Sequence, residues 1–232
     1  MLVYGRNVAK EMLESKKSIK SVILQKGFSD KNIISLIEKR NLSVQYMGKK
    51  ELEAFAKYSH QGIILDIEDF KYAILDDFIH NDNALVLVLD HLEDPHNLGA
   101  IIRTSEAAGA SGIIIPKDRG IKVNATVMKT SAGALNNIPI SVVTNLSQTI
   151  KELKDNGFWI VGTDMDGSDD YRDVDYSGKI AIVIGNEGKG MSDIVKKSCD
   201  FIVRIPMYGK VNSLNASVSA GILIYEAIRN KK

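Results

Sequence analysis

The sequence is poor in cysteine, in long apolar runs and in net charge, and each shortage excludes a class of protein. Cys199 is the only cysteine among 232 residues, which excludes a disulfide within the chain and a zinc site built from several cysteines. No apolar run approaches the ~20 residues of a membrane-spanning helix, and the opening MLVYGRNVAK lacks the apolar core of a signal peptide. We therefore expect a cytoplasmic protein.

The formal net charge of +1 gives no general electrostatic reason to bind nucleic acid, so such binding would depend on local basic clusters. Hydrophobic residues make up 44% of the chain and charged residues 25%, which is typical of a globular protein. His91 and His96 do not share a helical face and have no cysteine partners. We expect no metal site.

The first 70 residues alternate short helix-like and strand-like segments, which predicts a small α/β domain over residues 1–70. Residues 66–83 are rich in acidic side chains and carry no sustained period, which predicts a linker at 71–83. The expected helices are 7–14, 30–38 and 49–58, and the expected strands are 22–24, 44–46 and 62–65.

Residues 84–232 predict a second α/β domain, in which apolar strands alternate with helices. That alternation indicates a parallel sheet covered on both faces, and such sheets bind ligands beyond the carboxyl ends of their strands. The expected strands are 84–89, 113–115, 140–143, 159–163, 180–184 and 202–205. The loops that the rule selects are 90–97, 163–168, 185–190 and 207–214.

The last of these loops leads into a helix expected from Asn212 to Arg229. Asn212 and Ser213 are helix-capping residue types, and a helix that begins there aims free N–H groups and a positive dipole end at the loop. That arrangement suits a phosphate or carboxylate. The simpler alternative is that Ser213 only caps the helix.

Arg103 is unusual because its helix, expected over 98–108, looks largely buried from Ile101, Ile102, Ala107 and Ala108. It lies either on the solvent face of that helix or across the predicted site.

Two common nucleotide signatures are missing. No G-x-G-x-x-G follows a predicted strand, and Met191 takes the lysine position of a P-loop in GNEGKGMS. A Rossmann cofactor site or an NTPase is disfavoured.

Three motifs resemble those of the SpoU/TrmH branch of the SPOUT RNA methyltransferases. They are DPHNLGAIIRT at 94–104, IGNEGKGM at 184–191, and IPM at 205–207 with SLNASV at 213–218. Ala216 stands where that family is expected to have valine. The first domain, with Tyr4-Gly5 and His60-Gln61-Gly62, is similar to the RNA-binding domain of the subgroup that methylates a guanosine ribose in bacterial 23S ribosomal RNA.

The resemblance implies a 2′-O-ribose methyltransferase that uses S-adenosylmethionine, a C-terminal deep trefoil knot, and a homodimer with its active sites at the subunit interface. The cofactor contacts that it implies are Thr163, Gly185, Ile205 and Leu214. The catalytic and RNA-facing residues that it implies are Asn97, Arg103, Glu187, Ser213 and Asn215. The alternatives are a transfer RNA target and a catalytically silent RNA-binding protein.

Arg103 is a reluctant base because a guanidinium stays protonated up to a pKa of ~12 or more. We expect it to bind the adjoining phosphate bidentately and to stabilise the developing alkoxide, with Glu187 and Asn97 orienting it.

Two basic clusters are expected to hold the RNA elsewhere, although each is equally well explained as solvated surface charge. They are Lys117, Arg119, Lys122 and Lys129 in the second domain, and Lys16, Lys17, Lys20 and Lys26 in the first.

Overall fold

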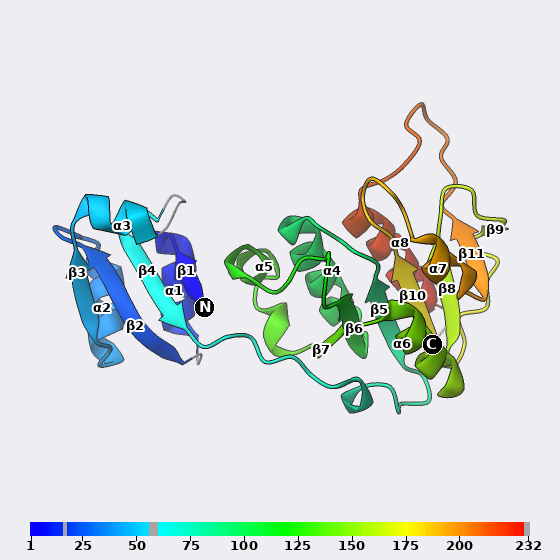
Figure 1. Cartoon of the computed structure of the whole chain (residues 1–232), viewed down its shortest axis with the longest axis horizontal. Coiled ribbons are helices and arrows are strands. Elements are labelled where there is room, and N and C mark those ends of the chain that lie inside the picture. The colour runs from blue at the N-terminus through cyan, green and yellow to red at the C-terminus, as the bar shows by residue number, and fades with distance from the viewer. Residues whose placement is uncertain (16–17, 56–59, 230–232) are drawn as a thin grey trace. The chain divides into compact units, whose positions relative to one another are not determined.

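The computed structural model describes residues 1–15, 18–55 and 60–229, and the chain divides into two compact units, Met1–Lys71 and Tyr72–Lys232 (Figure 1). The expected end of the helix at Tyr58, and also Lys16 and Lys17, lie outside the described residues. Among the described helices, each is too short or too polar to cross a membrane.

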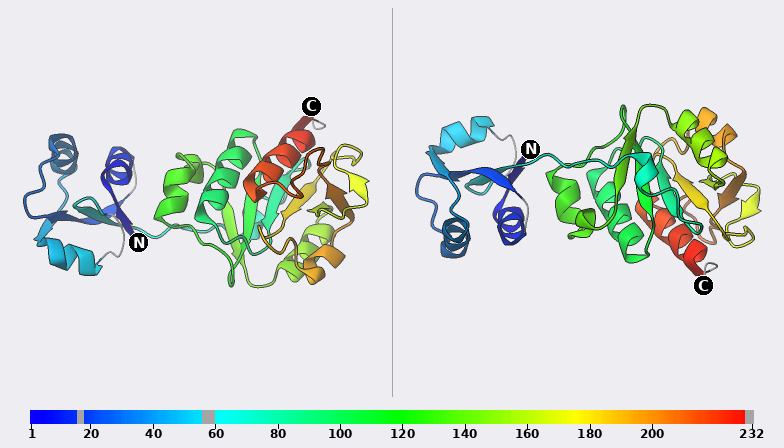
Figure 2. Two further views of the ribbon diagram at one scale, coloured as in Figure 1. Left: turned by 90° about the horizontal axis from the view of Figure 1, so that it is seen from above. Right: turned by 90° about the horizontal axis from the view of Figure 1, so that it is seen from below.

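The first unit is a four-stranded sheet in the order β1-β4-β2-β3, in which β4 runs antiparallel to β1 and β2, and β3 runs parallel to β2. Helices α1 and α2 lie on one face of the sheet and α3 on the other (Figure 2). Its elements are β1 (Leu2–Tyr4), α1 (Arg6–Glu14), β2 (Ile19–Gln25), α2 (Lys31–Lys39), β3 (Val44–Met47), α3 (Lys49–Phe55) and β4 (Ile63–Ile67).

Side chains from distant parts of the first unit close both ends of α1. Gly5 offers no side-chain cap, and the Gln61 side-chain oxygen accepts the Arg6 N–H at 2.8 Å instead. At the other end, Nη1 of Arg40 donates to the carbonyl oxygens of Met12, Leu13 and Ser15 at 3.1–3.2 Å. These groups would otherwise lack a partner within the helix, so both contacts stabilise the unit.

The second unit is a seven-stranded sheet in the order β7-β6-β5-β10-β8-β11-β9, and every neighbouring pair is parallel. The predicted parallel sheet is thereby confirmed. Its strands are β5 (Leu85–Leu89), β6 (Gly112–Pro116), β7 (Ile140–Val143), β8 (Trp159–Thr163), β9 (Asp169–Asp170), β10 (Ile180–Ile184) and β11 (Phe201–Arg204). Both β5 and β10 are buried along their whole length, which explains why they contain no polar side chain.

Helices cover both faces of this sheet: α4, α5 and α8 lie on one side, and α6 and α7 on the other (Figure 2). They are α4 (Pro95–Ala107), α5 (Ala125–Thr130), α6 (Leu146–Asp155), α7 (Asp193–Lys197) and α8 (Ala216–Arg229), with short helical turns η1 (Leu75–Asp77) and η2 (Ala134–Asn136). Helix α4 begins earlier than predicted because the Asp94 carboxylate accepts the His96 N–H at 2.8 Å and Pro95 suits the first helical position.

The segment predicted as a linker at 71–83 belongs largely to the second unit, which begins at Tyr72. The Ala73 N–H donates to the Ile140 carbonyl at 2.8 Å, beside the edge strand β7. Phe78 and Ile79 are buried in the core, and Phe78 packs where a side chain on Gly112 would clash. Two apolar side chains within an acidic stretch are enough to anchor it.

Candidate active site

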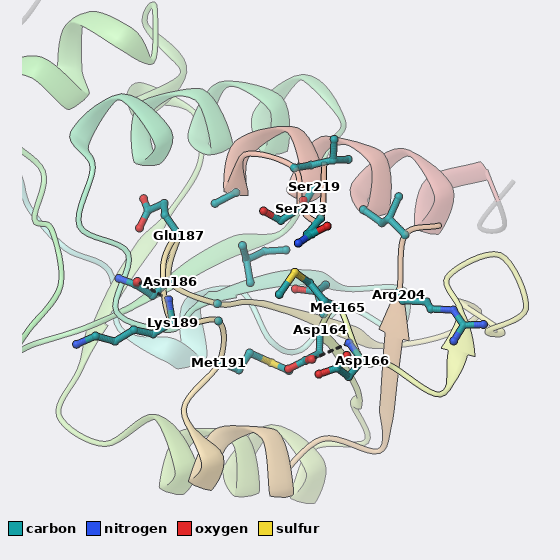
Figure 3. Close-up of a pocket in the computed structure, with 18 of the residues that line it drawn as sticks. Asp164, Met165, Asp166, Asn186, Glu187, Lys189, Met191, Arg204, Ser213 and Ser219 are labelled. Atoms are coloured by element: carbon teal, nitrogen blue, oxygen red, sulfur yellow. Dashed lines mark hydrogen bonds between the residues drawn. The ribbon is translucent and has the colours of Figure 1, made fainter. Parts of the chain in front are cut away.

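Three loops at the carboxyl ends of β8, β10 and β11 surround a pocket of ≈ 1000 Å³ (Figure 3). The strand order makes these three strands neighbours, so the loops that follow them meet at one edge of the sheet. The loop between β11 and α8 projects beyond the strand ends (Figure 1). The site therefore lies where ligands bind in parallel α/β sheets.

Gly185, the first residue after β10, has no room for a side chain. A Cβ atom there would lie 2.4 Å from the backbone of Gly190 and Met191, because the loop folds back on itself. Asn186 holds that fold: its side-chain oxygen accepts the N–H groups of Gly188 and Lys189 at 2.9 and 3.2 Å. The result is a tight turn whose main chain forms one wall of the pocket.

All four residues expected to contact a cofactor line this pocket: Thr163, Gly185, Ile205 and Leu214. The Thr163 hydroxyl donates to the Val183 carbonyl at 3.1 Å, so it also ties β8 to β10. Ile184 and Met191 extend the apolar part of the wall. The pocket thus combines apolar side chains with exposed main chain, as small-molecule sites usually do.

A chain of hydrogen bonds joins residues that are far apart in the sequence. The Asn97 amide nitrogen donates to Oε1 of Glu187 at 2.9 Å, and the Asn97 oxygen accepts from the Asn215 amide nitrogen at 2.9 Å. Since a carboxylate only accepts, it sets the orientation of Asn97 and through it that of Asn215. Asn97 is buried, so this network fixes the relative positions of α4, the β10 loop and α8.

The start of α8 differs from the prediction. The helix begins at Ala216, and Asn215 rather than Asn212 or Ser213 stands before it. The Asn215 oxygen accepts the N–H and the hydroxyl of Ser217 at 2.9 and 2.6 Å. Ser213 lies in the preceding loop, exposed and on the pocket wall, where Figure 3 shows it with Glu187 and Asp164 from the other two loops.

Arg103 does not meet Glu187 or Asn97, contrary to the expectation that these residues orient it. Its side chain is exposed and has no hydrogen bond or ion pair within the described part of the chain. The reason is helical geometry: six residues turn a helix by ~600°, so Arg103 faces ~120° away from Asn97. Ala107, expected to be buried, is exposed one turn further along the same stripe. The solvent-face alternative for Arg103 is the one observed.

An ion pair that the sequence did not indicate closes another side of the pocket. Nζ of Lys196 donates to Asp164 at 2.7 Å, and both residues line the pocket. Burial opposes ionisation of Asp164, but the hydrogen bond from Lys196 and one from the Asp166 N–H leave its pKa below the usual range. The position of Asp164 directly after a buried strand was the available signal.

The basic residues after β6 are not equivalent. Lys117, Arg119 and Lys129 are exposed, whereas the Lys122 ammonium group donates to the Pro116 carbonyl and burial lowers its pKa. Lys122 therefore shapes the loop 117–122. The Ile121 N–H donates to the Leu92 carbonyl at 2.7 Å, which ties this loop to the one after β5.

These features define an α/β protein with a small-molecule pocket at the carboxyl edge of a parallel sheet and a separate small domain. Residues 84–225 match the model of the SpoU rRNA methylase family, and residues 2–73 match that of the RNA 2′-O ribose methyltransferase substrate-binding domain. The chain belongs to the SpoU rRNA methylase family.

Individual relatives agree with this assignment over nearly the whole chain. YacO of Bacillus subtilis (strain 168), named as a TrmH family tRNA/rRNA methyltransferase, is 42% identical over 237 residues, which cover 99% of this chain and 95% of that protein. The SpoU methyltransferase AviRb from Streptomyces viridochromogenes, crystallised with AdoMet, superimposes with a TM-score of 0.80 at 26% identity, covering 99% and 89% of the two chains. An AdoMet-bound rRNA methyltransferase from Sinorhizobium meliloti gives a TM-score of 0.75 at 28% identity, covering 98% and 86%.

Proposed function

We propose that this protein transfers a methyl group from S-adenosylmethionine to a ribose 2′-hydroxyl of RNA, with a guanosine of 23S ribosomal RNA as its target. The observation that carries the proposal is the pocket at the carboxyl edge of the sheet, with the Glu187–Asn97–Asn215 network beside it, in a chain of the SpoU family. The match of residues 2–73 to a substrate-binding domain for 2′-O ribose methylation supports the ribose as the acceptor.

The residues of the pocket fit S-adenosylmethionine. The pocket is large enough for a nucleoside with an amino-acid arm, and Ile205 and Leu214 offer apolar contacts for a base. The absence of a side chain at Gly185 lets the loop fold back tightly, so that its main chain forms a wall of the pocket. When bound, the cofactor supplies an electrophilic methyl group on a sulfonium.

The protein's own contribution is to position the ribose and to stabilise the negative charge that develops on the 2′-oxygen as its proton passes to water. A hydroxyl is a weak nucleophile, so alignment accounts for much of the rate enhancement. Arg103 has no partner within the described residues that would compete for it, which leaves its planar guanidinium available for a phosphate. Held there, it also stabilises charge that develops on the attacking oxygen.

We further propose a homodimer in which Arg103 serves the pocket of the partner subunit. Helix α4 presents Arg103, and helix α8 follows Asn215. Both helices expose apolar surface, α4 at Ala107 and α8 at Val218 and Tyr225, which are 49% and 55% exposed. Covering that surface would bury apolar area and bring Arg103 to a pocket it does not reach within its own chain. Mixing an Arg103→Ala variant with an Asn215→Ala variant should restore part of the activity, because one of the two sites in a mixed dimer would be intact.

A deep trefoil knot in the second unit is part of the same proposal. The position of β10 between β5 and β8, both of which precede it in the chain, supports a threaded path for the residues that follow. The pocket loops after β10 and β11 are the ones that such a path would bring together. Two candidate RNA-holding groups complete the proposal: Lys117, Arg119 and Lys129 in the second unit, and Lys20 and Lys26 in the first.

A labelled-methyl transfer assay on unmodified 23S ribosomal RNA and on transfer RNA tests the function. Ribose methylation removes the hydroxyl that attacks the phosphodiester in alkali, so the modified nucleotide is found as a protected bond. We expect transfer to ribosomal RNA with protection after one guanosine. A substrate with a 2′-deoxynucleotide at that position is the matched control and should accept no methyl group.

The same assay separates the alternatives. Methylation of transfer RNA alone would make transfer RNA, and not 23S ribosomal RNA, the substrate. The name of the Bacillus subtilis relative mentions both kinds of RNA, so this outcome is worth testing. Binding of RNA with no transfer to either substrate would favour a catalytically silent RNA-binding protein. The presence of Asn97, Arg103, Glu187, Ser213 and Asn215 in one chain speaks against that outcome.

A further inference from the structure

His91 adopts a backbone conformation that histidine does not favour. It lies two residues after β5 with φ of 58°, in the left-handed region. This turn points the His91 carbonyl at the Asn186 side chain, which donates to it at 2.8 Å. Glycine would make the same turn without the steric cost that a side chain adds there. The backbone contact therefore explains the turn but not the choice of histidine.

The imidazole ring of His91 is held by a buried carboxylate. Nδ1 of His91 lies 2.5 Å from Oδ1 of Asp90, which is 1% exposed. The other Asp90 oxygen accepts both the N–H and the hydroxyl of Ser192, at 2.6 and 2.9 Å. Since a carboxylate can only accept, Nδ1 carries the hydrogen and Nε2 is the ring atom left for a ligand. The side chain is 35% exposed, so a ligand can reach it.

The position of His91 points to RNA rather than to the cofactor. His91 is not among the residues that line the pocket. It lies beside the loop 117–122: a Cβ atom on Gly120 would be 3.7 Å from the His91 Cα, and Leu92 is hydrogen-bonded to Ile121. The exposed side chains of Lys117 and Arg119 belong to that loop. A ring with a fixed orientation therefore stands beside a loop that carries exposed cations suited to a phosphate backbone.

We infer that His91 is an RNA-positioning residue, whose Nε2 hydrogen-bonds the sugar–phosphate backbone of the substrate strand held by Lys117 and Arg119. This inference rests on the proposed RNA methylation. A neutral ring accepts a hydrogen bond from a ribose 2′-hydroxyl, and a protonated ring donates one to a phosphate oxygen. Both groups belong to the same backbone, and Asp90 with Ser192 keeps the ring aimed in either case.

Steady-state kinetics of His91→Asn, His91→Gly and His80→Asn test the inference on the full chain. Asparagine tolerates the left-handed backbone but lacks Nε2, and glycine removes the ring while relieving the backbone. His80 is a matched control, because it also faces an aspartate, Asp76, at 4.0 Å but is exposed outside the site. We expect the RNA KM to rise about 3- to 10-fold in both His91 variants, the value of one hydrogen bond. The kcat, the affinity for S-adenosylmethionine and the RNA KM of His80→Asn should stay at wild-type values.

The outcomes separate a contact from a structural role. Wild-type RNA KM in His91→Asn would overturn the inference, as would recovery of wild-type KM by glycine alone, since that would reduce His91 to a backbone turn. Loss of cofactor affinity together with RNA affinity would also overturn it, because the ring would then be a loop support. A salt dependence of RNA affinity shallower by about 0.7 in log–log slope identifies a phosphate contact, and an unchanged slope identifies the 2′-hydroxyl. Failure of the wild-type protein to methylate any RNA would instead refute the proposed function, whatever His91 does.

Discussion

The two units of this protein use their polar side chains in different ways. In the first unit, Arg40 and Gln61 are engaged in closing the ends of α1 and so contribute to folding. In the second unit, Asn97, Glu187 and Asn215 bind one another at the edge of a pocket, and Arg103 is left exposed. The first set of contacts stabilises a fold, whereas the second set gathers polar groups from distant segments at one pocket.

Arg103→Ala should produce the largest effect, and a loss of turnover in this variant would place the chemistry in the second unit. We expect kcat to fall about 10²- to 10³-fold, because the charge that forms on the attacking oxygen loses its partner. Affinity for S-adenosylmethionine, measured by calorimetry, should not change, since the proposed partner of Arg103 is an RNA phosphate and not the cofactor. Arg103→Lys keeps the charge but loses the planar fork, so near-normal turnover in that variant would contradict bidentate phosphate binding.

Gly185→Ala should raise the Kd for S-adenosylmethionine about 10-fold or more. The new methyl group would lie 2.4 Å from the Gly190 and Met191 backbone, so the loop must move out of position. Gly188→Ala is the matched control in the same loop, because its Cβ would approach nothing closer than 3.7 Å. Calorimetric titration of both variants should show a clear difference, and equal affinities would show that the tight turn is irrelevant to binding.

Removal of residues 1–71 tests the comparison directly, because the cut falls between the two compact units. We expect the RNA Kd to rise about 10-fold and to become less sensitive to salt, as cations such as Lys20 and Lys26 are lost. The Kd for S-adenosylmethionine should stay the same. If filter binding gave equal RNA affinity for the full and shortened proteins, the first unit would have no role in holding RNA.

Asp164→Asn should have the smallest effect, lowering the free energy of unfolding by about 0.5–1 kcal/mol at pH 7 through loss of the Lys196 ion pair. The pKa of Asp164 is lowered in the folded state, so its contribution is present above the ordinary value of 3.8 and is lost as pH falls through the lower folded value. Urea unfolding at pH 7 and in acid should therefore show that the free energies of unfolding of the wild-type and variant proteins converge as the pH falls. A difference in the free energy of unfolding that did not change with pH would point to packing and not to the ion pair.

Much of the fold was predictable because it depends on local pattern. The largely apolar run at 159–163 and the continuous apolar run at 180–184 predicted β8 and β10 with the observed bounds. Element ends were harder to predict. Strand β11 is shifted by one residue from the predicted range. The start of α4 at Pro95 was missed because the Asp94 cap and a proline in the first turn were not interpreted as a helix start. The anchoring of 72–83 was missed because Phe78 and Ile79 stand among acidic residues without a period.

The predicted site residues divide in the same way. Those placed directly at strand ends, such as Thr163, Gly185 and Ile205, line one pocket because parallel strands end at one edge. Contacts that depend on which helical face a side chain occupies were not predictable with the same certainty. Arg103 and Asn97 lie in one helix, yet one is exposed and the other is buried against Asn215.

By itself, the sequence determined which segments are apolar strands and which motifs mark the family, because apolar runs, periodicity and motifs are local properties of the chain. Only the tertiary structure decided that Glu187 meets Asn97 across 90 positions and that Asn97 meets Asn215 across 118. Those contacts follow from the strand order, with β10 between β5 and β8, and from the orientation of α4 against α8. Neither is a property of any single stretch of residues, since both depend on how distant elements pack together.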